Sequence, residues 1–332
     1  MTDQSPASPD GRRLSLPARP GSNVGRVPTT PPPHAPSPPA AAWRDVAPDA
    51  LTTFCTIEAV AAHSLPAALR VPVRAAIAAI LGVASTDEEE VVAADDRVPA
   101  CVEFAEQFVV DVAGITEPQR RMMTAAMGAD SFTFVQALYV ADIFTRARIA
   151  IEKLFDDPLG AVQPQSNSGS ELWPLLERFM QQVALLPALD PLTTELVRLR
   201  GAQVHNCRLC QSRRSVKALD AASSADVFDH IAADNPDLSD RERIALTLTD
   251  ALVTQPASID AALVAEVHTH FDVAEIVEIV FDVVRNAANK IAVALGGDAP
   301  VVSEGVEFYD IDASGEVVAD IDIDIVRGAT TR

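Results

Sequence analysis

Apolar residues in much of this sequence recur at alternating steps of three and four positions, which is the spacing of one face of an α-helix. The longest example runs from about Val273 to Leu295. Asp272 and Glu275 form a capping-box pattern where it begins, and a glycine pair at Gly296 supplies a stop. Aromatic residues are only 5% of the chain, so such helices must pack mainly through aliphatic side chains. These patterns predict an all-α fold.

Further helix starts are marked by short polar signals. Thr116 with Gln119 and Ser239 with Glu242 have the spacing of capping boxes, and Ser258 is a candidate cap for a later helix. We therefore expect helices joined by short turns along most of the chain.

The two halves of the helical region echo one another. A shift of about 140 residues places an apolar face at 135–155 over the helix at 275–295. We interpret this as two tandem helical domains, a degenerate one at 45–162 and a second at 171–300. A polar stretch at 163–170 is the expected linker between them.

Both ends of the chain differ from this helical region. Half of the 24 prolines lie within the first 48 residues, so residues 1–44 are expected to be a disordered, proline-rich arm. At the other end, Val306–Val318 alternates around the turn Asp312–Gly315 and predicts a short β-hairpin. The segment 301–332 is therefore expected to be a hairpin followed by an acidic tail.

The charge of the chain excludes several classes of partner. With 26 basic and 47 acidic residues the formal net charge is −21. Such a field repels phosphate backbones and anionic lipid surfaces, so we expect no nucleic acid and no membrane partner. No apolar stretch approaches the roughly 18 residues of a spanning helix, and no signal-peptide pattern occurs, so a cytoplasmic location is expected.

The main candidate for chemistry is a cysteine pair. Cys207 and Cys210 are two of only four cysteines, and their spacing allows a disulfide. If a helix begins at this pair, its free N–H groups favour a thiolate. Arg208, Arg213 and Arg214 add positive charge nearby. The pattern indicates a reactive thiol.

Glu195 lies twelve residues before Cys207, which would be about 18 Å along one straight helix. However, His205 and Asn206 form a plausible break. A second helix that folds back would place Arg214 between Glu195 and the two cysteines, which predicts a Glu195–Arg214 ion pair.

The run Glu-Leu-Val-Arg-Leu-Arg-Gly-Ala-Gln that starts at Glu195, followed by the Cys-x-x-Cys pair, resembles the carboxymuconolactone decarboxylase/alkylhydroperoxidase D superfamily. The similarity spans about 175–297, with a degenerate echo over 55–155. It implies two tandem alkylhydroperoxidase D-like helical domains in a homo-oligomer that acts as a thiol peroxidase or disulfide reductase.

The resemblance also assigns roles to the thiols. Cys210 would attack a hydroperoxide or disulfide substrate, and Cys207 would then form the disulfide. A dithiol donor, a lipoyl- or thioredoxin-like protein, would reduce it, with no cofactor and no metal. The decarboxylase branch generally lacks paired thiols, so the pair points to redox chemistry.

One position departs from the pattern of that superfamily. A histidine that relays a proton between thiol and glutamate is replaced by Arg214, which stays protonated and cannot shuttle a proton. His205 could supply a titrating group, although a solvated turn histidine is the reading we favour. We therefore expect weak or altered peroxidase activity.

Three other readings of the pair stay open. It could be half of a zinc site, although only His205 is nearby in sequence. It could be structural, in a helical oligomer without catalysis. The chain could also be an enzyme like the decarboxylases of the superfamily.

Overall fold

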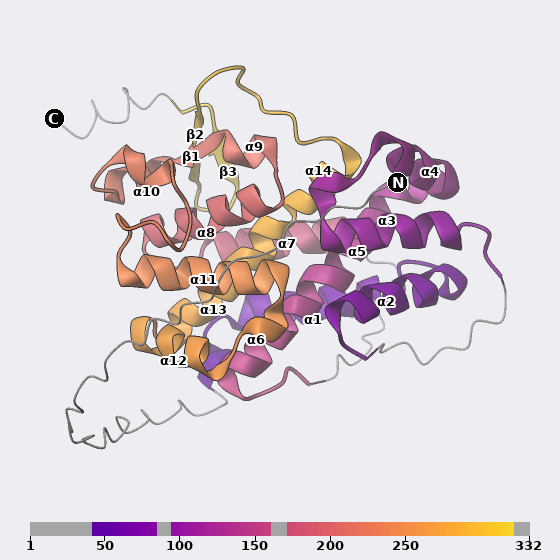
Figure 1. Ribbon diagram of the computed structural model, residues 1–332, viewed down its shortest axis with the longest axis horizontal. Coiled ribbons are helices and arrows are strands. Elements are labelled where there is room, and N and C mark those ends of the chain that lie inside the picture. Colours follow the sequence, from indigo (N-terminus) through magenta and orange to yellow (C-terminus); the bar gives the residue numbers. More distant parts are fainter. Residues whose placement is uncertain (1–41, 85–93, 161–170, 322–332) are drawn as a thin grey trace, which may run out of the picture. The chain divides into compact units, whose positions relative to one another are not determined.

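The computed structural model describes residues 42–84, 94–160 and 171–321 (Figure 1). Most of these residues are helical, as the apolar spacing predicted. The helices are α1 (Pro48–Ala61), α2 (Ala67–Leu81), α3 (Val98–Val110), α4 (Glu117–Met127), α5 (Ser131–Tyr139), α6 (Thr145–Phe155), α7 (Leu172–Ala184), α8 (Pro191–Val204), α9 (Arg208–Gln211), α10 (Val216–Ala221), α11 (Asp240–Thr254), α12 (Ala261–His270), α13 (Val273–Ala287) and α14 (Asn289–Leu295).

Some expectations fall outside the described residues. These are the arm up to residue 41, the linker at 163–170 and the tail beyond residue 321. Ala42–Asp45, at the end of the expected arm, form a 3-10 turn in which Trp43 is buried. Its indole nitrogen donates a hydrogen bond to Asp157.

The polar signals mark most helix starts correctly. All three capping boxes are present, at Thr116 with Gln119, at Ser239 with Glu242 and at Asp272 with Glu275. The cap predicted at Ser258 is wrong. Ser258 belongs to a 3-10 turn, and Asp260 instead accepts the backbone N–H of Leu263 at the start of α12.

Each long helix predicted by an apolar face is interrupted. The segment 273–295 is divided at Ala288 into α13 and α14. The face at 135–155 runs through α5 and α6, but a π-helical turn, Val140–Phe144, lies between them. A π-turn keeps the helix continuous, so the apolar spacing alone could not reveal it.

The main core is built by both halves of the chain. Phe54 of α1 stacks on Phe144 of the π-helical turn with 4.3 Å between ring centroids, and on Phe281 of α13 with 5.9 Å. Phe179 of α7 contacts the same three rings. The two predicted helical domains therefore share one hydrophobic core.

Helix α8 lies between this core and a smaller second one. Val197 belongs to the main core, whereas Leu196 and Leu199 pack with Phe228 and Leu246 in the second. Because α8 is covered on both sides, by α13 and by α10 and α11, its position is tightly fixed. This is the helix that carries Glu195.

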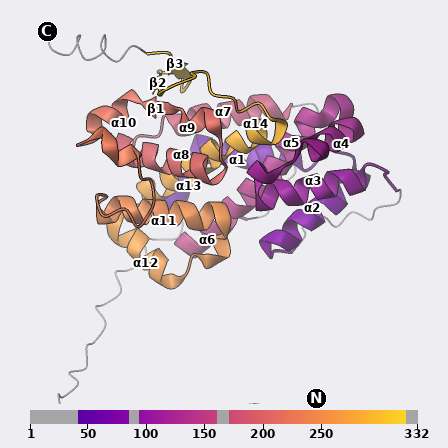
Figure 2. The same cartoon turned by 45° about the horizontal axis from the view of Figure 1, so that its top comes forward.

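A small sheet completes the fold beside α9 and α10 (Figures 1 and 2). Strand β2 (Glu307–Ile311) pairs antiparallel with β3 (Val317–Ala319), which confirms the predicted hairpin. Strand β1 (Arg213–Ser215) pairs with β2 in parallel and was not predicted, because three residues show no alternation. The strand that follows the cysteine pair is thus joined to the hairpin.

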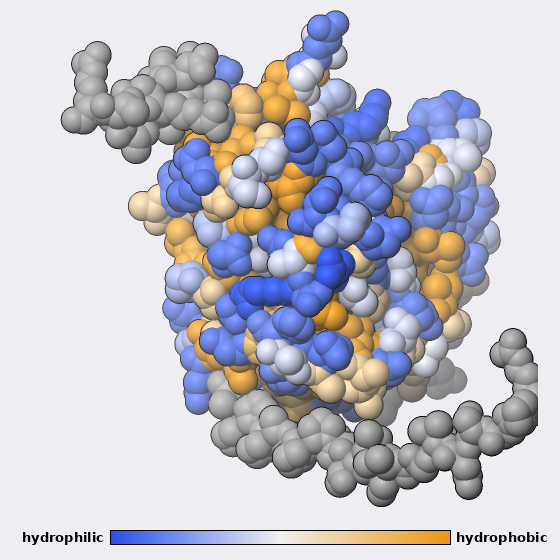
Figure 3. All heavy atoms as spheres, turned by 60° about the vertical axis from the view of Figure 1, so that its left-hand side comes forward, coloured by the Kyte–Doolittle hydropathy of each residue, from blue (hydrophilic) through white to orange (hydrophobic). Residues whose placement is uncertain are grey.

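The surface is mixed in character. On the face turned forward in Figure 3, hydrophilic residues interrupt the hydrophobic ones over most of the area. None of the helices in the described ranges has the length and apolar character needed to cross a membrane.

Candidate functional site

Glu195 is the buried centre of the site. Its side chain is about 1% exposed and accepts two hydrogen bonds from Arg198, at 2.6 and 2.7 Å. The backbone N–H of Ser215 donates a third, and the hydroxyl of Tyr309 a fourth at 2.7 Å. The carboxylate therefore joins α8, β1 and β2.

The ion pair predicted between Glu195 and Arg214 is wrong. The expected second helix is the single turn α9, which ends at Gln211, so Arg214 lies in β1. Its guanidinium donates to the carbonyls of Gln211 and Arg213 and lies 6.0 Å from the ring of Phe228. The ion-pair partner is Arg198, one helical turn after Glu195.

The predicted break before the cysteine pair is present. Helix α8 ends at Val204, and Asn206 adopts a left-handed conformation with a φ of 48°. Cys207 then caps α9, with its sulfur accepting the N–H of Cys210. Both thiols are free, and their Sγ atoms lie 2.7 Å apart. A disulfide, at about 2.05 Å, needs only a small movement.

The two thiols differ strongly in acidity. The pKa of Cys210 is lowered from 9.0 to about 7, first by the hydrogen bond from Cys207 and then by Arg198, Asn289 and Arg213, which together outweigh burial. The same hydrogen bond, together with burial, raises the pKa of Cys207. At neutral pH Cys210 is thus about half thiolate, while Cys207 keeps its proton.

Histidine 205 is not a solvated turn residue, contrary to the expectation. It is 4% exposed, and burial lowers its pKa to about 3, so the ring is neutral. Its Nδ1 lies 2.8 Å from Oδ1 of Asn289. Because an amide oxygen only accepts, Nδ1 carries the hydrogen in this pair. The Asn289 side chain also helps to lower the pKa of Cys210.

Of the three arginines expected to act on the thiol, Arg213 helps to lower the pKa of Cys210. Arg198, which was not among them, contributes more. Arg198 donates to the carbonyl of Cys210 at 2.8 Å, and Arg213 pairs with Glu307 at 2.5 Å. Arg208 turns away to Asp298, and its side chain is 59% exposed.

Sequence reasoning had no role for Arg198 or Tyr309 at the thiol pair, although the spacing of Arg198 from Glu195 on one helix was an available signal. For Asn289, on the polar flank of the helix predicted at 273–295, a contact with the cysteine helix or a neighbouring subunit and a surface position were equally open. Tyr309 lies far away in sequence and carried no signal.

The other cysteines lie apart from this site. Cys101 is buried, which raises its pKa to about 11, and Cys55 is half-buried with a raised pKa. Across residues 42–84, 94–160 and 171–321, no three His, Cys, Asp or Glu side chains are arranged to hold a metal ion.

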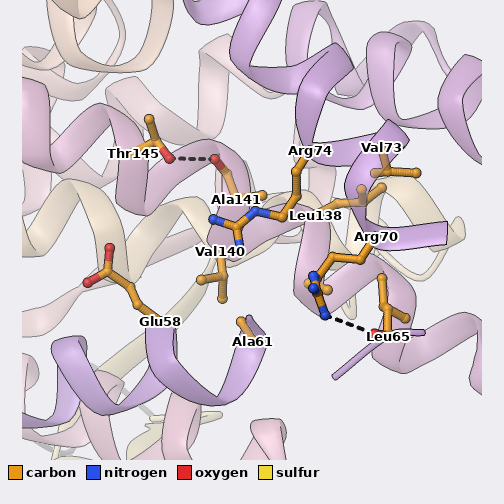
Figure 4. A pocket seen from close by; sticks show the side chains of 11 residues that line it. Glu58, Ala61, Leu65, Arg70, Val73, Arg74, Leu138, Val140, Ala141 and Thr145 are labelled. Carbon is orange, nitrogen blue, oxygen red and sulfur yellow. Dashed lines mark hydrogen bonds between the residues drawn. The ribbon is translucent and has the colours of Figure 1, made fainter. Parts of the chain in front are cut away.

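The first half has a small cavity of its own, of about 50 Å³. Arg70 and Arg74 reach into it from α2, opposite Glu58 of α1 (Figure 4). A shift of 124 residues places Arg74 over Arg198 of the second half. No cysteine lines this cavity among the described residues, and Glu58 pairs there with Arg148.

Comparisons with known proteins give relatives but no activity. No family model and no solved structure matches the chain. An uncharacterized protein of Escherichia coli, YnjA, is 33% identical over 93 residues, which is 27% of this chain and 51% of that protein. The uncharacterized proteins MT2376 and Rv2313c, from two strains of Mycobacterium tuberculosis, are each 43% identical over 228 residues, covering 65% of this chain and 78% of theirs. The chain therefore belongs to the same protein family as these uncharacterized mycobacterial proteins.

Proposed function

We propose that the protein is a dithiol oxidoreductase of the alkylhydroperoxidase D-like type, with Cys210 as the nucleophile and Cys207 as the resolving thiol. The observation that carries the proposal is the asymmetry of the pair. The two sulfurs lie 2.7 Å apart, and the pKa of Cys210 is lowered while that of Cys207 is raised.

The first step needs no histidine relay. The Cys210 thiolate attacks the outer oxygen of a hydroperoxide, which breaks the O–O bond and leaves a sulfenic acid on Cys210. The alkoxide leaves with the proton of Cys207, whose sulfur lies 2.7 Å from the reacting sulfur. The products are an alcohol, the sulfenic acid and a Cys207 thiolate.

The second step closes the disulfide. The Cys207 thiolate attacks the Cys210 sulfur and displaces hydroxide, so one peroxide is reduced by the two electrons of the thiol pair. A dithiol donor, such as a lipoyl- or thioredoxin-like protein, then reduces the disulfide by thiol exchange. We further propose that the protein acts in the cytoplasm, where such donors keep thiols reduced, and that it forms a homo-oligomer.

Glu195 and Arg214 act in this scheme by position. The Glu195–Arg198 pair holds the guanidinium that contacts the backbone of Cys210. Arg214 fixes the end of α9 through the Gln211 carbonyl. His205 orients Asn289 and does not exchange a proton at working pH.

The test is consumption of an organic hydroperoxide with dithiothreitol as donor. The parent and Cys55→Ser should both turn over peroxide, while Cys210→Ser should lose the activity. Cys207→Ser, treated with peroxide in the absence of dithiothreitol, should reduce a single equivalent and stop at the sulfenic acid. Equal rates in the parent and Cys210→Ser would refute the proposal.

A further inference from the structure

A cavity of about 320 Å³ lies next to residues that surround the thiol pair. Its walls come from α7, from the junction of α13 and α14, and from the hairpin. Asn289, whose side chain helps to lower the pKa of Cys210, lines it together with Arg198, which donates to the Cys210 carbonyl. A molecule held in this cavity can therefore contact two of the side chains that surround the reactive cysteine.

Two donors on the α13 wall could serve a ligand. The Arg285 side chain is only 14% exposed and makes an ion pair with Asp282 at 3.8 Å, which is longer than a hydrogen bond. The amide nitrogen of Asn286 is buried and has no hydrogen-bond partner. Both residues line the cavity. Buried donors of this kind cost free energy unless a ligand supplies the acceptor.

Apart from the exposed Glu177, the other charges of the cavity have partners among the described residues. Arg198 pairs with Glu195 and Arg213 with Glu307, and neither carboxylate lines the cavity. Of the two glutamates that do line it, Glu316 accepts from Gln181. Three arginines face two glutamates here, in a chain with a net charge of −21. Arg285 is the guanidinium left to meet a ligand.

The rest of the lining includes apolar side chains, namely Trp173, Met180 and Val317. We infer that this cavity binds an organic carboxylate with an apolar chain, whose carboxylate is held by Arg285 and Asn286. That such a molecule, as a hydroperoxide, is the substrate of Cys210 rests on the proposed function, whereas binding of the carboxylate does not.

The inference is tested with octanoate and its uncharged analogue octanamide, by isothermal titration calorimetry on the full chain. The parent should bind octanoate, and octanamide at least tenfold more weakly. Arg285→Gln should weaken octanoate at least tenfold without changing octanamide. Arg121→Gln is the matched control, because it removes the same charge from a side chain that is 67% exposed and outside the cavity.

A second variant distinguishes loss of the carboxylate site from a failure of Arg285→Gln to fold. Asn286→Asp places a carboxylate opposite the ligand and should abolish octanoate binding while octanamide binding persists. Equal binding of octanoate and octanamide, or unchanged octanoate binding in Arg285→Gln, would overturn the inference.

The titration separates this inference from the proposed redox function. Cys210→Ser should bind octanoate like the parent even though it cannot react with peroxide. If the parent binds octanoate in this way but consumes no hydroperoxide, the carboxylate site stands and the redox proposal fails. Turnover of hydroperoxide by a parent that does not bind octanoate would overturn the carboxylate site alone.

Discussion

Lys290 of α14 and Asp142 of the π-helical turn form a fully buried ion pair, 2.5 Å apart, although they are 148 residues apart in sequence. Arg146 binds the other oxygen of the same carboxylate at 2.6 Å. Burial raises the pKa of Asp142, but Lys290 and Arg146 outweigh it and hold that pKa below its usual value. The pair ties the first half of the chain to the residue next to Asn289.

We expect Asp142→Ala to destabilise the protein by about 3–5 kcal/mol, because it leaves two buried cations without a counter-ion. The measurement is the free energy of unfolding in urea. Glu117→Ala is the control, since its pair with Arg121 is exposed, and it should cost less than about 1 kcal/mol. A similar cost for both variants would show that the buried pair does not anchor α14.

The second prediction concerns the acidity of Cys210. Its alkylation by iodoacetamide should rise with pH around a midpoint near 7, as its lowered pKa requires. Asn289→Ala removes a donor to the thiolate and should slow alkylation at pH 7 about fivefold. Asn286→Ala, on the neighbouring helix α13, should leave the rate unchanged. A midpoint near 9 in the parent would contradict the site described here.

A third prediction follows from Asp282, which is buried with one carboxylate oxygen unpaired. Burial raises its pKa from 3.8 to about 7, with Arg285 opposing the shift. A carboxyl with a raised folded pKa stabilises the fold fully below its unfolded pKa and loses that contribution as pH rises through about 7.

The free energy of unfolding of Asp282→Asn, relative to that of the parent, should therefore increase by on the order of 1–3 kcal/mol when the pH rises from 5 to 8. Thermal and urea unfolding at both pH values measure the difference. Asp240→Asn, at a side chain that is 74% exposed, is the matched control for the same chemical change outside the core and is measured at the same two pH values. If the stability difference between Asp282→Asn and the parent is the same at both pH values, the raised pKa of Asp282 is contradicted.

The hairpin supplies a fourth prediction. Gly315 has a φ of 85°, and a Cβ added there would lie 2.4 Å from the backbone oxygen of Gln181 in α7. Gly315→Ala should therefore cost about 2–3 kcal/mol and expose the hairpin to hydrogen exchange. Gly305→Ala has a similar φ of 75° but meets nothing within 4 Å, so it should cost about 1 kcal/mol.

The sequence allowed the local features of this fold to be predicted. Capping boxes, the break before Cys207 and the hairpin each depend on residues close in the chain, and all are present. The ion pair of Glu195 was predicted wrongly, because it required the length and direction of a helix that proved to be a single turn. The partners of Glu195 and Cys210 that come from Tyr309 and Asn289 depend on tertiary packing, which no local pattern encodes.

The hydrogen bond from Tyr309 to Glu195 can form only late in the synthesis of the chain. During synthesis the thiol pair leaves the ribosome well before Asn289 and Tyr309, which complete its surroundings. Until Asn289 has been added, Cys210 lacks one of the groups that lower its pKa, and until Tyr309 has been added, Glu195 lacks one of its four hydrogen bonds and Arg198 lacks the ring beside it. The surroundings of the reactive cysteine are therefore complete only near the end of synthesis.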